Sequence, residues 1–245
     1  MSEFFDMHCH LLFGVDDGPK EMEESLSLLR QEYDDGVRTV YLTPHYRKKM
    51  FECSAEKIRE HFLLLQERVN RELPDMKLRL GCEIHVSMDT VEEIKSGRCA
   101  TLGGTEFVLL EFSEAAEKKY ILERCHAVMN KGFTPIIAHA ERCSIVRKDP
   151  QLLKRLGDMG MYIQFDAGSI IGEDGFFLKQ FCKKAMQQDL IHFIGSDAHA
   201  MASRKPNLGK CAAYIEKIMG TEYRDQIMRI NPMEIVERSL ANRYE

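Results

Sequence analysis

The stretch SDAHAMASR, residues 196–204, follows an apolar run and predicts a loop that opens at the end of a buried strand. Successive side chains on extended backbone point to opposite sides of a strand, so we expect Asp197 and His199 to face the same way. Aspartate and histidine are both common ligands of divalent metals. The stretch therefore predicts one half of a metal site at the end of a strand.

A matching pair lies near the other end of the chain. The segment FFDMHCH places His8 and His10 two residues apart at the end of an apolar run, with Cys9 turned away between them. Because the two pairs stand near opposite ends of the sequence, they predict a closed structure that brings the first and last strands together.

Short apolar segments alternate with segments of helical periodicity along the chain, which is typical of an α/β fold with a parallel sheet. We predict seven strands, at residues 4–10, 37–43, 76–84, 105–112, 133–142, 161–169 and 190–199. This number favours a distorted (β/α)7 TIM-like barrel, one unit short of the eightfold form. No Pro/Gly/Ser-rich linker or repeat divides the sequence, so we expect residues 1–245 to form a single domain.

Two helical regions have clear signals. A helix is predicted over residues 54–72, with Ser54 as its N-cap and Leu63, Leu64 and Leu65 as apolar positions. From about residue 208 the chain is predicted to form two or three C-terminal helices.

Composition narrows the class of protein. The net charge of −5 offers no basic face for nucleic acid. The acidic N-terminus lacks the apolar core of a signal peptide, and no apolar run is long enough to insert in a membrane. The 8 cysteines form no CxxC pair, which favours reduced thiols and a cytoplasmic location.

Polar residues collect at the carboxyl ends of six of the predicted strands. They are His8, His10, His45, Glu83, Glu111, His139, Asp197 and His199. This is the face on which parallel barrels carry their active sites. Carboxylates that converge on one barrel mouth repel one another, and a cation is the simplest way to stabilise them. The set therefore predicts a metal centre.

The remaining histidines serve as an internal comparison. His61 and His126 fall within helices and His192 lies early in its strand, so we assign them structural or surface roles. His85 stands two residues beyond Glu83 and could reach the rim of the site, although a structural role is slightly favoured.

One motif in the sequence would instead favour a cysteine-dependent mechanism. CSAEKIR, residues 53–59, fits the Cys-x5-Arg spacing of cysteine phosphatases. The segment contains no glycine, follows no predicted strand and has Glu56 where an anion would sit. We therefore interpret the spacing of Cys53 and Arg59 as a coincidence.

The segments MHCH, VDDGP, TPHY, GCEI, LLEF, AHAER and SDAH, in this order, resemble the motifs of the polymerase-and-histidinol-phosphatase (PHP) family of metal-dependent phosphoesterases. More narrowly, they resemble the bacterial tyrosine-protein phosphatases that act on autophosphorylating tyrosine kinases of capsule and exopolysaccharide synthesis. The resemblance extends over about residues 6–208 and includes QFDAGSIIG. It implies a PHP fold and a phosphotyrosine-bearing protein as the substrate partner.

The resemblance also implies three divalent metal ions, with manganese expected ahead of iron or zinc. The first ion would be held by His8, His10, Glu83 and Asp197. The second would share Glu83 and add Glu111 and His139. The third would be held by Asp17, His45 and His199. Asp16 is then left as an ordinary turn residue.

Catalysis in this family uses a water activated between metals, without a covalent enzyme intermediate. Arg142 and Arg204 are the arginines in matching positions, and a planar guanidinium can clamp a phosphate with two hydrogen bonds. The predicted catalytic set is Arg142, Arg204 and His199, the last also a metal ligand. The general acid stays open, with His85 as one candidate.

Three departures from the tyrosine-phosphatase pattern line the expected substrate rim. Ala200 stands where asparagine is common, Cys143 where an aromatic is common, and residues 46–52 replace a histidine-containing stretch. These positions leave open a histidinol-phosphate or other small-molecule phosphatase on the same scaffold. A metal-stabilised binding barrel is the non-enzymatic alternative. The oligomeric state has no signal in the sequence.

Overall fold

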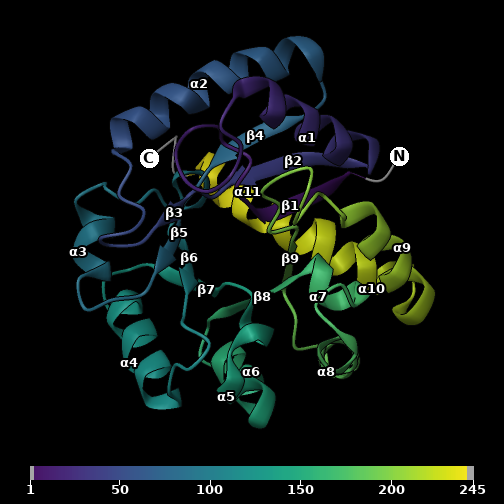
Figure 1. Ribbon diagram of the computed structural model, residues 1–245. Coiled ribbons are helices and arrows are strands. Elements are labelled where there is room, and N and C mark those ends of the chain that lie inside the picture. Colours follow the sequence, from purple (N-terminus) through teal and green to yellow (C-terminus); the bar gives the residue numbers. More distant parts are fainter. Residues whose placement is uncertain (1–2, 242–245) are drawn as a thin grey trace.

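The computed structural model describes residues 3–241 (Figure 1). Its strands are β1 (Phe4–Cys9), β2 (Val37–Leu42), β3 (His45–Tyr46), β4 (Lys77–Leu80), β5 (Glu83–His85), β6 (Phe107–Glu111), β7 (Thr134–Ile137), β8 (Tyr162–Asp166) and β9 (Phe193–Gly195). All pairs of neighbouring strands are parallel, in the orders β1-β2-β4 and β3-β5-β6-β7-β8-β9. The predicted α/β class is confirmed.

Two of the predicted strands are each broken in the middle. The second ends at β2 and resumes as β3 after Pro44, and the third is divided into β4 and β5. Backbone hydrogen bonds cross the break, from Gly81 N to Leu42 O (2.8 Å) and from Glu83 N to Pro44 O (3.1 Å). The two sheets are therefore parts of one curved sheet with seven strand positions, as predicted.

The first and last strands close the barrel. His10 N donates to Ala198 O (2.9 Å) and Asp197 N donates to His8 O (2.9 Å), just beyond the ends of β1 and β9. Figure 1 shows these two strands side by side at the centre of the molecule. The expected distorted (β/α)7 barrel is confirmed, and its closure brings the two ligand pairs together.

A bulge in β1 points the histidines into the barrel. Asp6 pairs with Val40 and Cys9 with Leu42, so β1 has one more residue than β2 between these pairs. Met7 packs in an interior apolar cluster formed by residues of several strands. The extra residue lets His8 reach the same interior, where strict alternation would turn it away.

Helices surround the strands (Figure 1). They are α1 (Met22–Asp34), α2 (Ala55–Glu72), α3 (Thr90–Lys95), α4 (Lys118–Met129), α5 (Ser144–Lys148), α6 (Gln151–Asp158), α7 (Ala167–Ile171), α8 (Phe176–Gln187), α9 (Leu208–Met219), α10 (Thr221–Asp225) and α11 (Asn231–Ala241). Within residues 3–241, no helix combines the length and the apolar character that a membrane crossing needs.

The helix α2 begins as predicted but buries less than expected. Ser54 Oγ accepts a hydrogen bond from Lys57 N (3.2 Å), which confirms the N-cap. Leu65 is fully buried, whereas Leu63 and Leu64 are exposed. Of the three apolar positions, only Leu65 therefore packs in the core, because consecutive residues of a helix point in different directions.

Candidate metal centre

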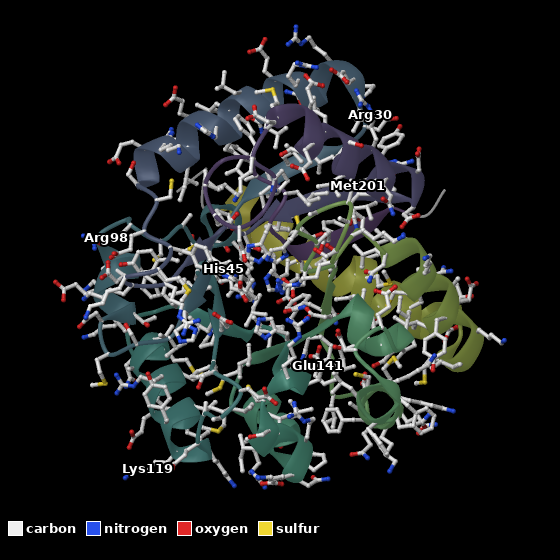
Figure 2. All side chains as sticks on the ribbon, in the orientation of Figure 1. Arg30, His45, Arg98, Lys119, Glu141 and Met201 are labelled. Carbon is white, nitrogen blue, oxygen red and sulfur yellow. The ribbon has the colours of Figure 1, made fainter. Side chains whose placement is uncertain are left out.

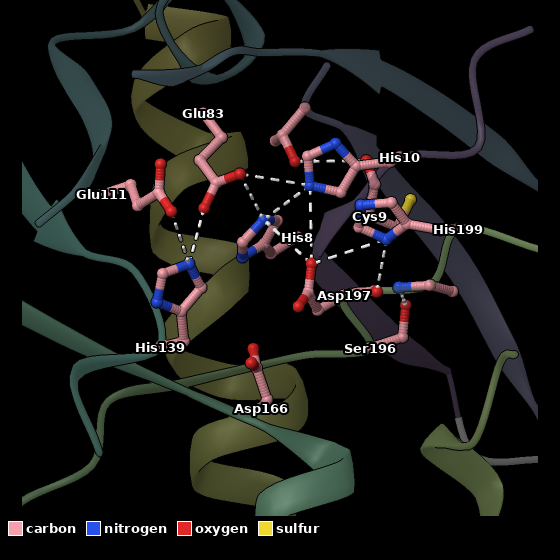
Figure 3. A network of polar contacts seen from close by, with 12 residues as sticks. His8, Cys9, His10, Glu83, Glu111, His139, Asp166, Ser196, Asp197 and His199 are labelled. Carbon is pink, nitrogen blue, oxygen red and sulfur yellow. Dashed lines mark hydrogen bonds and ion pairs between the residues drawn. The ribbon is translucent and has the colours of Figure 1, made fainter. Parts of the chain in front are cut away.

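Four donor atoms from β1, β5 and the loop after β9 converge at the barrel mouth (Figure 3). The Nε2 atoms of His8 and His10 lie 3.1 Å apart. Glu83 Oε2 lies 3.4 and 3.2 Å from them, and Asp197 Oδ1 lies 3.7 and 3.5 Å from them. All four side chains are buried. These are the residues predicted to share the first metal.

The hydrogen bonds behind the two histidine rings fix where their protons lie. Gln164 Oε1 accepts from His139 N (2.8 Å), while its Nε2 donates to Asp166 Oδ1 (2.9 Å). The amide oxygen therefore faces His8 Nδ1, at 3.2 Å, and this nitrogen must donate. On the other ring, His10 Nδ1 donates to a carboxylate at 2.9 Å.

In the neutral rings, both Nε2 atoms then carry lone pairs, and these lone pairs face each other inside a buried site. Such an arrangement is repulsive unless a proton or a metal ion lies between them. Metal-bound histidines characteristically donate their second ring nitrogen to a carboxylate or an amide, as His8 and His10 do here. Glu83 Oε2 is also buried, and no donor is aligned to hydrogen-bond it although ring nitrogens of His10 and His45 lie 3.2 and 2.8 Å away. The residues present fit a divalent cation.

A second group forms around the other oxygen of Glu83. His139 Nε2 lies 2.7 Å from Glu83 Oε1 and 4.0 Å from Glu111 Oε1. Glu111 Oε2 is hydrogen-bonded to His85 Nδ1 (2.8 Å). Glu83 thus presents one oxygen to each of two donor groups, and His85 holds Glu111 in place, in line with the structural role favoured for it.

A third group lies on the outer side of His10. Asp17 Oδ1 is 3.6 Å from His45 Nε2 and 3.4 Å from His199 Nε2. The rings of His45 and His199 each have their centroids 4.1 Å from that of His10. His45 Nδ1 also lies 2.8 Å from Glu83 Oε2, so the three groups are contiguous. Figure 2 shows His45 beside this central cluster of nitrogen- and oxygen-bearing side chains.

The structure thus brings all the residues predicted as metal ligands into one cluster at the barrel mouth. Donor atoms close enough to share an ion fall into three overlapping groups: His10, Asp17, His45 and His199; His8, His10 and Asp197; and His45, Glu83 and Glu111. The division of these residues among particular ions stays a prediction.

The backbone at two ligands differs from the extended form assumed above. Asp197 has φ +50° and His139 has φ +29°. The assumption of extended backbone was therefore wrong, although Asp197 and His199 both lie against His10. Asp197 also lies beside His8, and His199 joins the third group, with its Nδ1 donating to Asp197 O (2.8 Å). Left-handed backbone at residues other than glycine concentrates at functional sites.

Asp16 is more than the turn residue it was predicted to be. Its side chain is buried, and Oδ2 accepts from His10 Nδ1 (2.9 Å) and from His45 N (3.0 Å), while Oδ1 accepts from Gly18 N (3.0 Å). A Cβ at Gly18 would stand 1.9 Å from His10 O, so only glycine lets this loop approach so closely. Asp16 positions two candidate ligands.

Both predicted arginines contact the cluster. Arg142 donates to Asp197 Oδ2 (2.9 Å) and its second nitrogen lies 2.9 Å from Asp166 Oδ2. Arg204 donates to Asp197 Oδ2 (2.7 Å) and to His199 Nε2 (3.0 Å). Burial alone would raise the pKa of Asp197, but His8 and His10 in their protonated forms, together with both arginines, outweigh it and hold the pKa well below its usual value.

The charge state of His199 suits a metal ligand. Burial and the neighbouring His10 lower the pKa of His199 to about 4. The ring is therefore neutral near pH 7 and offers a lone pair on Nε2.

Gln164 and Asp166 of β8 are functional residues that the sequence reasoning missed. Gln164 orients His8 and His139, and Asp166 contacts Arg142 on the side away from Asp197. A signal for them was present in the sequence, because both are polar and stand two residues apart in the one predicted strand that received no site residue. The structure shows that both are buried.

The structure also shows the surroundings of the histidines that were assigned structural or surface roles, and of Cys53. His61 Nδ1 bonds Phe13 O (2.8 Å), His192 Nδ1 accepts from Ile163 N (3.1 Å), and His126 lies exposed on α4. Burial raises the pKa of the Cys53 thiol, which disfavours the thiolate that a cysteine phosphatase needs.

Comparison with known proteins identifies a matching family and several relatives. The family described as capsular polysaccharide synthesis, CpsB/CapC, matches residues 4–237. Tyrosine-protein phosphatase CpsB of Streptococcus pneumoniae is 34% identical over 236 residues, which cover 94% of this chain and 97% of CpsB.

Two solved structures are similar to this chain in fold. One comes from the crystal structures of YwqE from Bacillus subtilis and CpsB from Streptococcus pneumoniae, described as unique metal-dependent tyrosine phosphatases. It matches with a TM-score of 0.83 and 28% identity, over 96% of this chain and 92% of that one. Histidinol phosphate phosphatase from Lactococcus lactis shares the fold, with a TM-score of 0.60 at 13% identity over 90% of this chain and 95% of that one. The chain belongs to the CpsB/CapC family.

Proposed function

We propose that this protein is a metal-dependent protein-tyrosine phosphatase, a phosphoric monoester hydrolase that acts on an autophosphorylating tyrosine kinase of capsule or exopolysaccharide synthesis. The observation that carries the proposal is the position of Glu83, whose two oxygens face two different groups of donor atoms. The test is turnover of a phosphotyrosine peptide and of histidinol phosphate by the manganese-loaded protein. A preference for histidinol phosphate contradicts the proposal.

The proposed centre takes three divalent ions, manganese in the first place, with iron or zinc as alternatives. The ligand sets are His8, His10, Glu83 and Asp197; Glu83, Glu111 and His139; and Asp17, His45 and His199. When bound, such ions supply positive charge at the phosphate and acidify water for attack on phosphorus.

The protein's own contribution to the step is to hold the phosphate and the leaving group. Arg142 and Arg204 both donate to the same carboxylate oxygen of Asp197, and their remaining N–H groups can donate to phosphate oxygens. The leaving tyrosyl oxygen has a pKa of about 10, so it departs with modest help from an acid.

The cytoplasm is the proposed location. All 8 cysteines are free, and all but Cys53 are buried. Reduced, buried thiols without a disulfide framework are typical of proteins in a reducing compartment.

Arg142→Lys is expected to lower kcat for a phosphotyrosine peptide by about 10²-fold, because lysine keeps the charge but cannot bridge Asp166, Asp197 and a phosphate as a planar fork does. Steady-state kinetics measure the effect. Arg71→Lys, at an exposed arginine of α2, is the matched control and should match the parent protein. A parent-like kcat for Arg142→Lys would contradict the assigned role.

Asp16→Asn is expected to weaken metal binding by about 10- to 100-fold, because His10 loses a charged acceptor behind its ring. The activity lost at low manganese should return at high manganese, which a direct catalytic role would not allow. Titration of activity against free manganese measures the shift. Asp158→Asn, at an exposed aspartate of α6, is the control. An unchanged manganese titration would show that Asp16 is only a turn residue.

A further inference from the structure

A pocket of about 650 Å³ opens beside the metal centre. Its walls come from the loops that follow β6, β7 and β8 and from the first turns of α8, all on the face of the barrel that carries the candidate ligands. Residues of α5 and α8 line it, and Figure 1 shows these two helices in the same part of the molecule. Arg142 and Arg147 line one wall, and Phe176, Phe177 and Phe181 line the other.

The aromatic wall is exposed to an unusual degree. Phe176 is 68% and Phe177 is 88% exposed, and their rings meet edge to face at 5.9 Å. Within residues 3–241, most of the surface of both side chains stays open to solvent. Each ring left in water forgoes the stabilisation that burial gives, and grouped exposed aromatics mark surfaces that bind a ligand or a partner.

One side chain belongs both to the pocket and to the metal centre. Arg142 lines the pocket and also donates to Asp197 Oδ2 (2.9 Å). Arg147, the second arginine of the wall, donates to the carbonyl oxygen of Arg142 and to Glu114 Oε1 (2.8 Å). A ligand that reaches from the metal centre past Arg142 enters this pocket.

Charges in the pocket are largely balanced. Arg147 pairs with Glu114 at 2.8 Å, and Arg142 pairs with Asp166 at 2.9 Å and lies 3.9 Å from Asp174. The unsatisfied part of the surface is therefore apolar and aromatic. A ligand that matches it presents an apolar side chain rather than a second acidic group.

We propose that this pocket binds the polypeptide segment next to the phosphotyrosine of a substrate protein, with a neighbouring apolar side chain packed on Phe176 and Phe177. The inference rests on the proposed function and deepens it, because it assigns part of the substrate specificity to residues outside the metal centre. A small phosphomonoester has no such segment and gains nothing from this wall.

The experiment compares three substrates in the manganese-loaded protein: a phosphotyrosine peptide with apolar neighbours, the same peptide with glycines in their place, and free phosphotyrosine. Phe177→Ala and Phe176→Ala are expected to raise KM for the apolar peptide about tenfold, the effect of losing one buried aromatic contact. The other two substrates should change by less than about twofold on the same reasoning. Leu63→Ala, at an exposed residue of α2, is the matched control.

Three other outcomes overturn the proposal. An equal loss on free phosphotyrosine places the phosphotyrosine ring itself on the aromatic wall. Unchanged kinetics on all substrates assign the wall no role in substrate binding, and a change confined to the association state, measured by light scattering, makes it a surface between copies of this chain. If the parent protein hydrolyses none of the three substrates, the proposed function fails, and that result is distinct from a failure of the pocket.

Discussion

Glu83→Gln is expected to lower phosphotyrosine hydrolysis by about 10³-fold or more, the scale of losing a central electrostatic group in an active site. Glutamine keeps the shape of the side chain but removes its charge. It also replaces one of the two carboxylate oxygens, facing either His139 or the pair His8 and His10, by an amide nitrogen, which donates hydrogen bonds but cannot bind a metal ion. Initial rates on a phosphotyrosine peptide and the metal content of the purified protein measure the effect.

A second buried glutamate provides the matched control. Glu32 of α1 is fully buried, and burial together with the charges of Asp6 and Asp35 raises its pKa well above the usual value. Glu32 lies outside the candidate ligand groups, so Glu32→Gln, which keeps the shape of the side chain, should leave hydrolysis and metal content unchanged. Equal losses in both variants would mean that the loss reflects damage to the fold rather than to the centre.

The ligands could be predicted from the sequence because of a property of parallel barrels. All strands end on the same face, so polar residues at strand ends meet whatever the details of packing. His8, Glu83 and His139 are far apart in the sequence. To predict that they meet, it was enough to assign each residue to a strand and to the carboxyl end of that strand. The fold class follows from the same alternation of strands and helices.

Features that depend on contacts between distant segments could not be predicted in this way. The bulge in β1 is set by its register with β2, and the left-handed backbone at Asp197 is held by the hydrogen bond from its N–H to His8 O. Neither has a local sequence signal. Asp16 has one, the turn in which it lies, but this signal describes only its local bond to Gly18 and not its bonds to His10 and His45.

Gly195 shows how the same packing constrains residues that carry no chemistry. A Cβ at this position would stand 2.5 Å from the Cβ of His8 and 2.9 Å from Nε2 of Gln164. The strand β9 therefore passes close to β1 and β8 only with glycine here, and the approach carries Asp197 to His8. The same close packing of β9 against β1 therefore closes the barrel and assembles the metal centre.

Removal of divalent metal is expected to abolish hydrolysis and to destabilise the protein, because lone pairs and carboxylates gathered around Glu83 then face each other without a cation. An ion present at 100 times its dissociation constant stabilises the folded state by about 2.7 kcal/mol for each site. For a chain of this size that corresponds to a rise in Tm of roughly 5–10 °C for one site. Thermal unfolding and peptide turnover, with chelator and after manganese is restored, measure both effects.

Cys53→Ser separates this mechanism from a cysteine-dependent one. The thiol lies outside the candidate ligand groups and its pKa is raised by burial, so the substitution should leave turnover unchanged in the presence of manganese. Activity that survives chelation but is lost in Cys53→Ser would contradict the metal mechanism. Metal-dependent stabilisation without turnover would instead support a binding barrel, because the same ligands would then hold ions that perform no hydrolysis.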